Sequence, residues 1–267
     1  MATIAERKTV PGRSQSIDRA ALILTCFSAA EPRVSLADLA ARLDLNQSTV
    51  YRYVATLQAA GLLARDGPRG GYRLGLRVVE LAGVALNELA VRREAIPEMD
   101  RLRDELGLLV NLALLDGADV LHLAHSAPPG WPVWVATPGR RAVAHCTALG
   151  KVLLAHHPWD EVRADIERHG WRPYTAHSIH DFERLRDELA AIRDQGHAVD
   201  DEERAIGSAC LAAPIRDHSG QVTAALSVTG TTATMPPDRR AQVTPKLLAA
   251  ASRVSLRLGH HDTLAYA

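Results

Sequence analysis

The stretch SLADLAARLDLNQSTVYRYVATL, residues 35–57, decides the fold of the N-terminal part of the chain. Ser35 precedes an apolar-periodic run and Asp38 follows three residues later, a pattern close to the capping box of a helix start. The apolar residues of the run share one helical face: Leu36, Leu39, Ala40 and Leu43. The pattern breaks at residues 44–46, which predicts the turn after the first helix of a pair.

A second helix is expected from Gln47 to about Ala60, with Asn46 as its N-cap and Gly61 as its C′ glycine. Four residues spaced i, i+3, i+4 and i+7 point inward: Val50, Tyr53, Val54 and Leu57. The polar side chains at the helix start and on its other side suit base edges and phosphates in a DNA major groove: Asn46, Gln47, Ser48, Thr49, Tyr51, Arg52 and Thr56. An ordinary helical hairpin with a solvated face is the alternative at this point.

The segment after Gly61 predicts the wing of a winged helix. Two short strand-like runs, residues 62–65 and 72–74, flank a loop rich in Gly, Pro and Asp, which indicates a β-hairpin. Arg69 lies at its tip, and Arg65 and Arg73 lie on its stems. All three can reach phosphates, which would set the register on DNA without reading sequence.

The flanking segments predict two further helices. Ser16 is expected to cap a first helix, with an inner face formed by Ile17, Ala20, Ala21, Leu24 and Phe27. Residues 76–96 predict one linker helix that is apolar over a wide arc, so that more than one side must be covered. Cover by the same helix of a second subunit would place two recognition helices on half-sites one DNA turn apart. Packing on the chain's own domains is the alternative.

Composition limits the classes of protein. The 267 residues are 47% hydrophobic and carry no net charge, but residues 1–80 hold 11 Lys/Arg against 7 Asp/Glu, and the remainder holds 20 against 24. A basic front and an acidic back fit a DNA-reading head on a separate body. Three scattered cysteines, no signal peptide and no long apolar run predict a soluble, cytoplasmic protein without disulfides, with no membrane partner.

The C-terminal part predicts an α+β domain with an antiparallel sheet, built on a new helix that starts at Pro97. Strands are expected at 108–115, 120–125, 133–135, 197–199, 209–215 and 222–229. Helices are expected at 147–156, 159–169 and 181–195, and a last one runs from Pro236-Pro237 to Leu258 with Pro245 as a candidate interruption.

Catalytic and metal-binding patterns are missing. The chain has no G-x-S-x-G, no P-loop and no placed G-x-G-x-x-G, so we expect no enzyme and no cofactor. His122 and His125 are three residues apart, which predicts opposite faces of a strand, and Cys146, Cys210 and His145 are scattered, so no metal site is expected. The pair His156-His157 and the acidic run 200–203 are interpreted as solvated surface.

A binding site for a small organic acid is the better hypothesis for this domain. Backbone N–H groups are free where a helix starts after Thr147, and the helix dipole there favours an anion. Ser227 and Thr229 are two residues apart, hence on one face of the last strand. Each feature alone has an ordinary structural explanation, so they describe a pocket only if the fold brings them together.

The chain resembles the IclR-type bacterial transcriptional regulators. The matching stretches follow the order of that family: SQSIDRAALIL at 14–24, residues 35–63, YRLG at 72–75, HCTALGKVLLA at 145–155, residues 193–220 and AALSVTG at 224–230. The resemblance implies a winged helix-turn-helix domain (1–75), a dimerising linker helix (76–96) and a GAF-like α+β effector-binding domain (97–267). Such regulators are dimers, or dimers of dimers, that bind operator DNA under control of a small metabolite.

The resemblance also implies an effector pocket, by position in the family's motifs: Ala148, Leu149, Asp200, Cys210, Ser227 and Thr229. Thr229 stands where the family often has Ser, so its extra methyl group would narrow the pocket. A metabolic enzyme with a winged-helix head and a constitutive DNA-binding protein are the alternative functions.

Overall fold

The computed structural model describes residues 14–67, 70–131 and 137–261. The chain divides into two compact units, residues 1–86 and 87–267, each with its own hydrophobic core. This division falls inside the range 76–96 that the sequence predicts as a linker. The predicted domain boundaries at 75/76 and 96/97 stay predictions.

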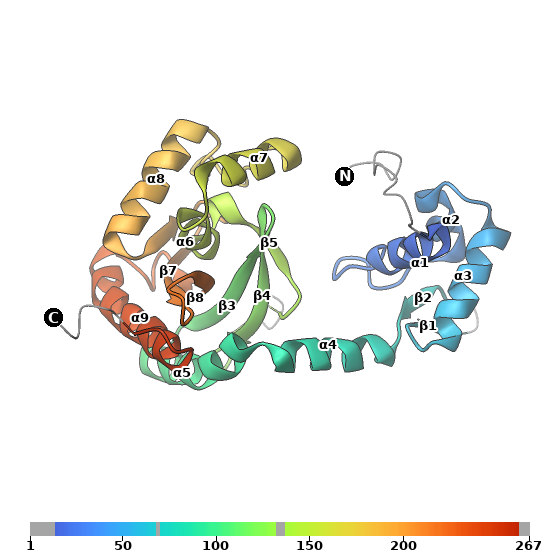
Figure 1. Ribbon diagram of the computed structural model, residues 1–267, viewed down its shortest axis with the longest axis horizontal. Coiled ribbons are helices and arrows are strands. Elements are labelled where there is room, and N and C mark those ends of the chain that lie inside the picture. The colour runs from blue at the N-terminus through green and yellow to red at the C-terminus, as the bar shows by residue number, and fades with distance from the viewer. Residues whose placement is uncertain (1–13, 68–69, 132–136, 262–267) are drawn as a thin grey trace. The chain divides into compact units, whose positions relative to one another are not determined.

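The N-terminal unit is a helix-turn-helix followed by a two-stranded antiparallel hairpin (Figure 1). Its elements are α1 (Gln15–Thr25), α2 (Leu36–Leu43), α3 (Gln47–Ala59), β1 (Leu63–Arg65), β2 (Tyr72–Leu74) and the start of α4 (Leu76–Glu88). Ile23, Leu39, Val50 and Val54 are fully buried in its core. Val34 pairs with Tyr72, which attaches the hairpin to the segment between α1 and α2.

Helix α2 is capped locally at both of its ends, and its C-terminal cap forms the turn into α3. The Ser35 hydroxyl accepts from the Asp38 N–H at 3.1 Å, but the Asp38 carboxylate accepts from the Ser35 hydroxyl, so only half of the expected capping box forms. Asp44 adopts the left-handed conformation (φ 52°), and the Leu45 N–H reaches back to the Ala40 carbonyl. This is a Schellman motif with Asp in the position that usually favours glycine.

The first helix differs from the prediction. It begins at Gln15, and Ser14 rather than Ser16 holds the N-cap position, without a side-chain cap. Ile17 is 70% exposed, whereas Ile23 is completely buried. Three of the five residues expected on the inner face, Ala20, Leu24 and Phe27, do pack against the core of this unit. The expectation was wrong for Ile17 and for Ala21, which is also exposed.

The linker also differs from the prediction. The helix breaks at Leu89, whose backbone is extended, and α5 runs from Ala90 to Leu106 with Pro97 inside it. Pro97 therefore does not start a helix. Pro97 is exposed, while Ala95 and Met99 are buried on either side of it, and it has no N–H to donate within the helix.

The C-terminal unit is an antiparallel six-stranded sheet in the order β5-β4-β3-β8-β7-β6. Its further elements are β3 (Leu109–Asp116), β4 (Asp119–Ser126), β5 (Arg141–Val143), α6 (Ala148–Ala155), α7 (Trp159–His169), α8 (Phe182–Gln195), β6 (Ala198–Asp201), β7 (Ser208–Arg216), β8 (Val222–Thr231) and α9 (Pro237–Arg257). Helices α5 and α9 cover one face, and α6, backed by α8, covers the other (Figure 1).

Most predicted elements of this unit are present, with three differences. Strand β5 was missed, the expected strand at 133–135 lies outside the described residues, and α9 continues through Pro245. A separate 3₁₀ turn, Ala144–Cys146, precedes α6. Within the described ranges, no helix is both long and apolar enough to pass through a membrane.

Candidate functional site

The exposed face of α3 carries the residues expected to read DNA, but they are not equally available. The Asn46 Oδ1 atom accepts from the Thr49 N–H and from the Ser48 hydroxyl, both at 2.8 Å, so Asn46 caps the helix as predicted. The Thr56 hydroxyl donates to the Arg52 carbonyl at 2.9 Å. The exposed Gln47, Tyr51 and Arg52 side chains then remain the long polar groups at the helix start.

The hairpin after α3 has the position of a wing. Helix α3 ends in a Schellman motif, in which Gly61 (φ 72°) turns the chain and the Leu62 N–H donates to the Leu57 carbonyl. Arg65 and Arg73 are exposed on the two strands, as expected for phosphate contacts. Arg69 lies outside the described residues.

A cavity of about 250 Å³ lies in the C-terminal unit between the sheet and the start of α6. The structure brings all six predicted effector-binding residues to its wall: Ala148, Leu149, Asp200, Cys210, Ser227 and Thr229. The other lining residues include Asn111, His122, Arg140, Thr147 and Arg204. The condition that the sequence left open, that the fold bring these residues together, is therefore met.

Strand register explains why these residues share one wall. Asp200 pairs with Cys210, Cys210 with Thr229 and Thr229 with Leu109, which forms one row across four strands. The next row on the same face contains Ser227 and Asn111. Because residues paired across strands project to the same side of a sheet, each row is presented to α6 as a unit.

His122 reaches this wall because β4 contains a β-bulge. Ala124 pairs with Leu112 and His122 with Ala113, so Leu123 is the extra residue. Because of this extra residue, His122 and His125 lie on the same face of the sheet. The prediction that they lie on opposite faces was therefore wrong. Burial, with Arg140 and His125 nearby, lowers the pKa of His122 to about 4, so its imidazole is neutral at pH 7.

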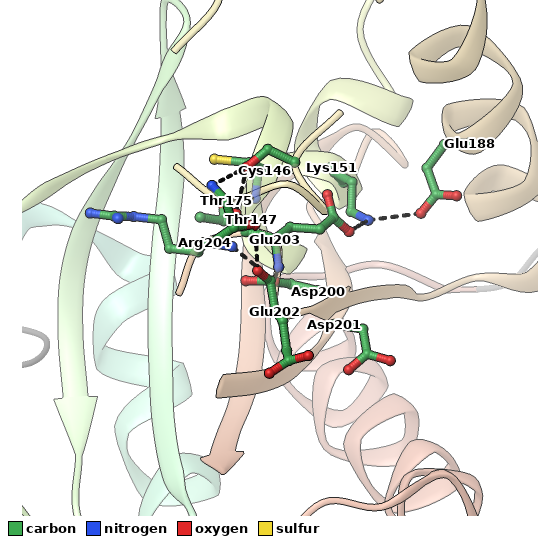
Figure 2. Close-up of polar contacts among 12 residues, drawn as sticks. Cys146, Thr147, Lys151, Thr175, Glu188, Asp200, Asp201, Glu202, Glu203 and Arg204 are labelled. Atoms are coloured by element: carbon green, nitrogen blue, oxygen red, sulfur yellow. Dashed lines mark hydrogen bonds and ion pairs between the residues drawn. The ribbon is translucent and has the colours of Figure 1, made fainter. Parts of the chain in front are cut away.

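Asp200 is the acidic residue of the cavity wall. It is 1% exposed, and its Oδ1 atom accepts from the Glu203 N–H at 2.9 Å and the Arg204 N–H at 3.2 Å (Figure 2). Burial and the nearby Glu203 carboxylate raise the pKa of Asp200 to about 7. At neutral pH the side chain is thus a mixture of acid and carboxylate, able to donate a hydrogen bond in its protonated form.

A buried ion-pair network lies directly behind this wall. The Lys151 ammonium, on α6 and 1% exposed, binds Glu203 at 2.5 Å and Glu188 at 2.8 Å (Figure 2). Asp201 is exposed and pairs with both terminal nitrogens of Arg240. The interpretation of residues 200–203 as solvated surface was therefore wrong for Asp200 and Glu203, because the turn after β6 folds under α6.

The start of α6 is shaped by Thr147 and Gly150. The Thr147 hydroxyl caps the helix by accepting from the Gly150 N–H at 3.2 Å. The first-turn N–H groups of Ala148 and Leu149 have no intrahelical acceptor, and both residues line the cavity. A Cβ atom on Gly150 would fall 2.2 Å from the Cα atom of Ala144, so this glycine permits close contact between α6 and the preceding turn.

The floor of the cavity is a hydrogen-bonded polar cluster. The Asn111 amide donates to the Ser227 and Thr229 hydroxyls at 3.5 and 3.4 Å, and the Thr229 hydroxyl donates to the Cys210 sulfur at 3.2 Å. Ser227 and Thr229 share a face of β8, as predicted. The Thr229 hydroxyl proton, however, is already donated to the Cys210 sulfur. Burial raises the pKa of the Cys210 thiol to about 12, so it remains protonated.

Among the described lining residues, sequence reasoning missed five polar ones: Asn111, His122, Arg140, Arg204 and Ser208. Asn111 left a signal, since it is a polar residue inside the apolar run of β3. The bulge that turns His122 inward left none. His156 was also misjudged, because its Nε2 atom is buried without a partner instead of solvated.

Both units match one family of proteins. The IclR helix-turn-helix domain matches residues 16–67, and the bacterial transcriptional regulator IclR C-terminal domain matches residues 83–256. The chain belongs to the IclR family of bacterial transcriptional regulators. It is a regulator with a helix-turn-helix DNA-binding domain, and its curated relatives are regulators rather than enzymes.

Relatives of this IclR-family chain align over almost its full length. The regulator XynR of Escherichia coli K12 is 30% identical, with 92% of this chain and 98% of XynR covered. The regulator KdgR of Dickeya chrysanthemi is 31% identical over 87% of this chain and 76% of KdgR. A regulator from Rhodococcus sp. RHA1 has a similar structure, with a TM-score of 0.81, 30% identity, and 92% and 98% of the two chains covered.

An IclR homologue from Microbacterium hydrocarbonoxydans was solved in complex with 4-hydroxybenzoate. It has a TM-score of 0.79 and 28% identity to this chain, with 91% of this chain and 98% of the homologue covered. A small molecule is therefore held by one solved member of the family.

Proposed function

We propose that this regulator is an effector-gated repressor or activator whose operator binding is controlled by a small carboxylate in the cavity between the sheet and α6. The carboxylate docks at the N–H groups of Ala148 and Leu149, where the helix dipole favours an anion. The Ser227 hydroxyl donates a further hydrogen bond. Protonated Asp200 meets an oxygen of the ligand, since two bare carboxylates would repel each other.

The single observation that carries this proposal is the convergence of six separately placed residues on one cavity wall. Charge supports it, because the wall contains the guanidinium-bearing Arg140 and Arg204 and one carboxyl group, that of Asp200. The Arg204 guanidinium stacks 3.7 Å from the centre of the Tyr174 ring, which holds that charge in place. The 4-hydroxybenzoate held by the Microbacterium homologue is an acid of the proposed class.

A homodimer is the proposed form that binds DNA. Helix α4 contains no buried residue, and its large apolar side chains are mostly solvent-exposed: Leu76 74%, Val79 67%, Leu81 52% and Val84 66%. An apolar surface of this kind is typical of an interface. We expect Val79→Asp/Leu81→Asp to yield monomers in sedimentation, and wild-type mass will distinguish a dimer from a tetramer.

The DNA-binding part is tested with footprints on the promoter region upstream of the protein's own gene. Arg52→Ala and Thr49→Ala together should abolish protection while the protein keeps its wild-type mass. Ala59→Ser, on an exposed position near the other end of α3, is the matched control. Protection that survives the double change would refute the assignment of α3 as the recognition helix.

The effector part is tested by calorimetric titration of a panel of small carboxylates that includes benzoate, 4-hydroxybenzoate, pyruvate and glyoxylate. Ser227→Ala should weaken the acid that binds best, whereas Thr223→Ala, an exposed change on the same strand, should not. Unchanged affinity in Ser227→Ala removes this residue from the site. Turnover of the bound acid would favour the enzyme alternative, and operator binding that never responds to any acid would favour a constitutive DNA-binding protein.

A further inference from the structure

Arg204 lines the cavity, and its guanidinium forms no hydrogen bond or ion pair with a described residue. The residue is partly buried, and its backbone N–H binds the Asp200 carboxyl group. Within the described ranges, the interaction of its side chain is the stacking on the Tyr174 ring. Its side-chain nitrogens are not enclosed, whereas the Nε atom of Arg172 is buried without a partner. The N–H groups of the Arg204 guanidinium are therefore accessible to a ligand.

The acidic run directly before Arg204 does not neutralise it. Figure 2 shows that the Arg204 side chain extends away from the Asp200 carboxyl group. Each carboxyl group of the run binds another group: Asp200 the N–H groups of the turn, Asp201 the Arg240 guanidinium, Glu202 the Gly207 N–H, and Glu203 the Lys151 ammonium. Four acidic residues thus lie next to Arg204 in the chain, and its positive charge is still left for another partner.

Stacking on Tyr174 leaves the edge of the Arg204 guanidinium open. The central carbon of this group lies 3.7 Å from the centre of the ring, so the flat side of the guanidinium covers the ring. The N–H groups of a guanidinium point outward in its own plane, and two of them match the two oxygens of a carboxylate. The stacking therefore positions the group for an anion without using its donors.

The charges of the cavity wall favour a ligand with more than one negative charge. Among the described lining residues, Arg140 and Arg204 are cations and Asp200 is the acid, while His122 is neutral because burial lowers its pKa. An anion in the cavity favours the protonated form of Asp200. These lining residues then carry two positive charges, and one carboxylate at the start of α6 balances half of that charge. Complementary charge is what gives a binding site its specificity.

We propose that the effector is a small dicarboxylic acid, with one carboxylate at the start of α6 and the second on the Arg204 guanidinium. The inference rests on the proposed function, and it adds the class of acid and a second anchor for it. The first carboxylate binds the N–H groups of Ala148 and Leu149, and the second accepts two hydrogen bonds from Arg204. The cavity of about 250 Å³ limits the ligand to a short diacid.

The test compares each diacid with the monoacid of the same carbon skeleton: succinate with butyrate, glutarate with pentanoate, adipate with hexanoate, and the three benzenedicarboxylates with benzoate. Dissociation constants are measured calorimetrically on the full-length protein. We expect at least one diacid to bind about tenfold or more tightly than its monoacid, because its second carboxylate gains charge-assisted hydrogen bonds. Arg204→Gln should remove this preference and leave the affinity for monoacids unchanged.

Arg186→Gln is the matched control, since Arg186 also lies over an aromatic ring, 5.9 Å from the centre of Trp159, but is exposed and does not line the cavity. Thermal unfolding identifies any variant that fails to fold, and the wild-type preference tests the inference without a variant.

Monoacids that bind the wild type as tightly as their diacids would overturn this inference alone. So would a preference for diacids that survives Arg204→Gln. An equal loss of affinity for monoacids and diacids in Arg204→Gln would also overturn it, because Arg204 would then hold the single carboxylate. No binding by any acid would overturn the proposed function as well.

Discussion

Asp200 makes the stability of the C-terminal unit depend on pH. Its pKa is 3.8 in the unfolded chain and about 7 in the folded protein. Between these values the folded state holds a proton that the unfolded state has released, so stability falls as pH rises through this window and the full cost is present above pH 7. A displacement of this size corresponds to about 4 kcal/mol.

Asp200→Asn should remove this dependence. The amide oxygen of Asn can still accept from the Glu203 and Arg204 N–H groups, which now bind the Asp200 Oδ1 atom. The variant has no proton to lose. Its unfolding free energy, relative to the wild type, should therefore increase by about 4 kcal/mol between pH 4 and pH 8.

Urea unfolding followed by tryptophan fluorescence is a suitable assay. All four tryptophans, Trp131, Trp134, Trp159 and Trp171, lie in the C-terminal unit, so the signal reports on that unit. Asp201→Asn is the control, because Asp201 is exposed and paired with Arg240, and its difference should not increase with pH. A pH-independent difference between Asp200→Asn and the wild type would refute the account of a buried, protonated Asp200.

The other predictions concern the supports of the two sites, and each is measured by urea unfolding. Gly150→Ala places a methyl group against the Ala144 backbone and should cost about 3 kcal/mol. Lys151→Met leaves the Glu203 carboxylate buried and unpaired, so it should lower the free energy of unfolding by about 3–5 kcal/mol. The double variant Lys151→Met/Glu203→Leu should restore most of this loss. Equal losses of stability in the single and the double variant would contradict the ion-pair explanation. Asn46→Ala removes the cap of α3 and should lower the free energy of unfolding by about 1 kcal/mol, while Asn46→Asp should be nearly neutral. For these two variants, urea unfolding is followed by circular dichroism.

The sequence alone determined the features that depend on neighbours in the chain. The cap at Asn46, the C′ glycine at Gly61 and the inward set Val50, Tyr53, Val54 and Leu57 involve residues within one or two helical turns. The cap, the glycine and the burial of Val50, Val54 and Leu57 are confirmed, whereas Tyr53 is only partly buried. Ser227 and Thr229 were placed on one face by the two-residue period of a strand. These interactions need no partner element, so composition and spacing suffice.

Only the tertiary structure decided which side of an element is buried by distant segments. The sequence predicts that the acidic run 200–203 is solvated, but the turn after β6 places Glu203 against Lys151. It also predicts that Ile17 is buried, but the buried side of α1 carries Ile23 instead. His122 entered the cavity through a bulge that one inserted residue produces in the pairing of β3 and β4. Register and packing between segments far apart in the chain are set by how the whole surface is buried, and no local pattern contains that information.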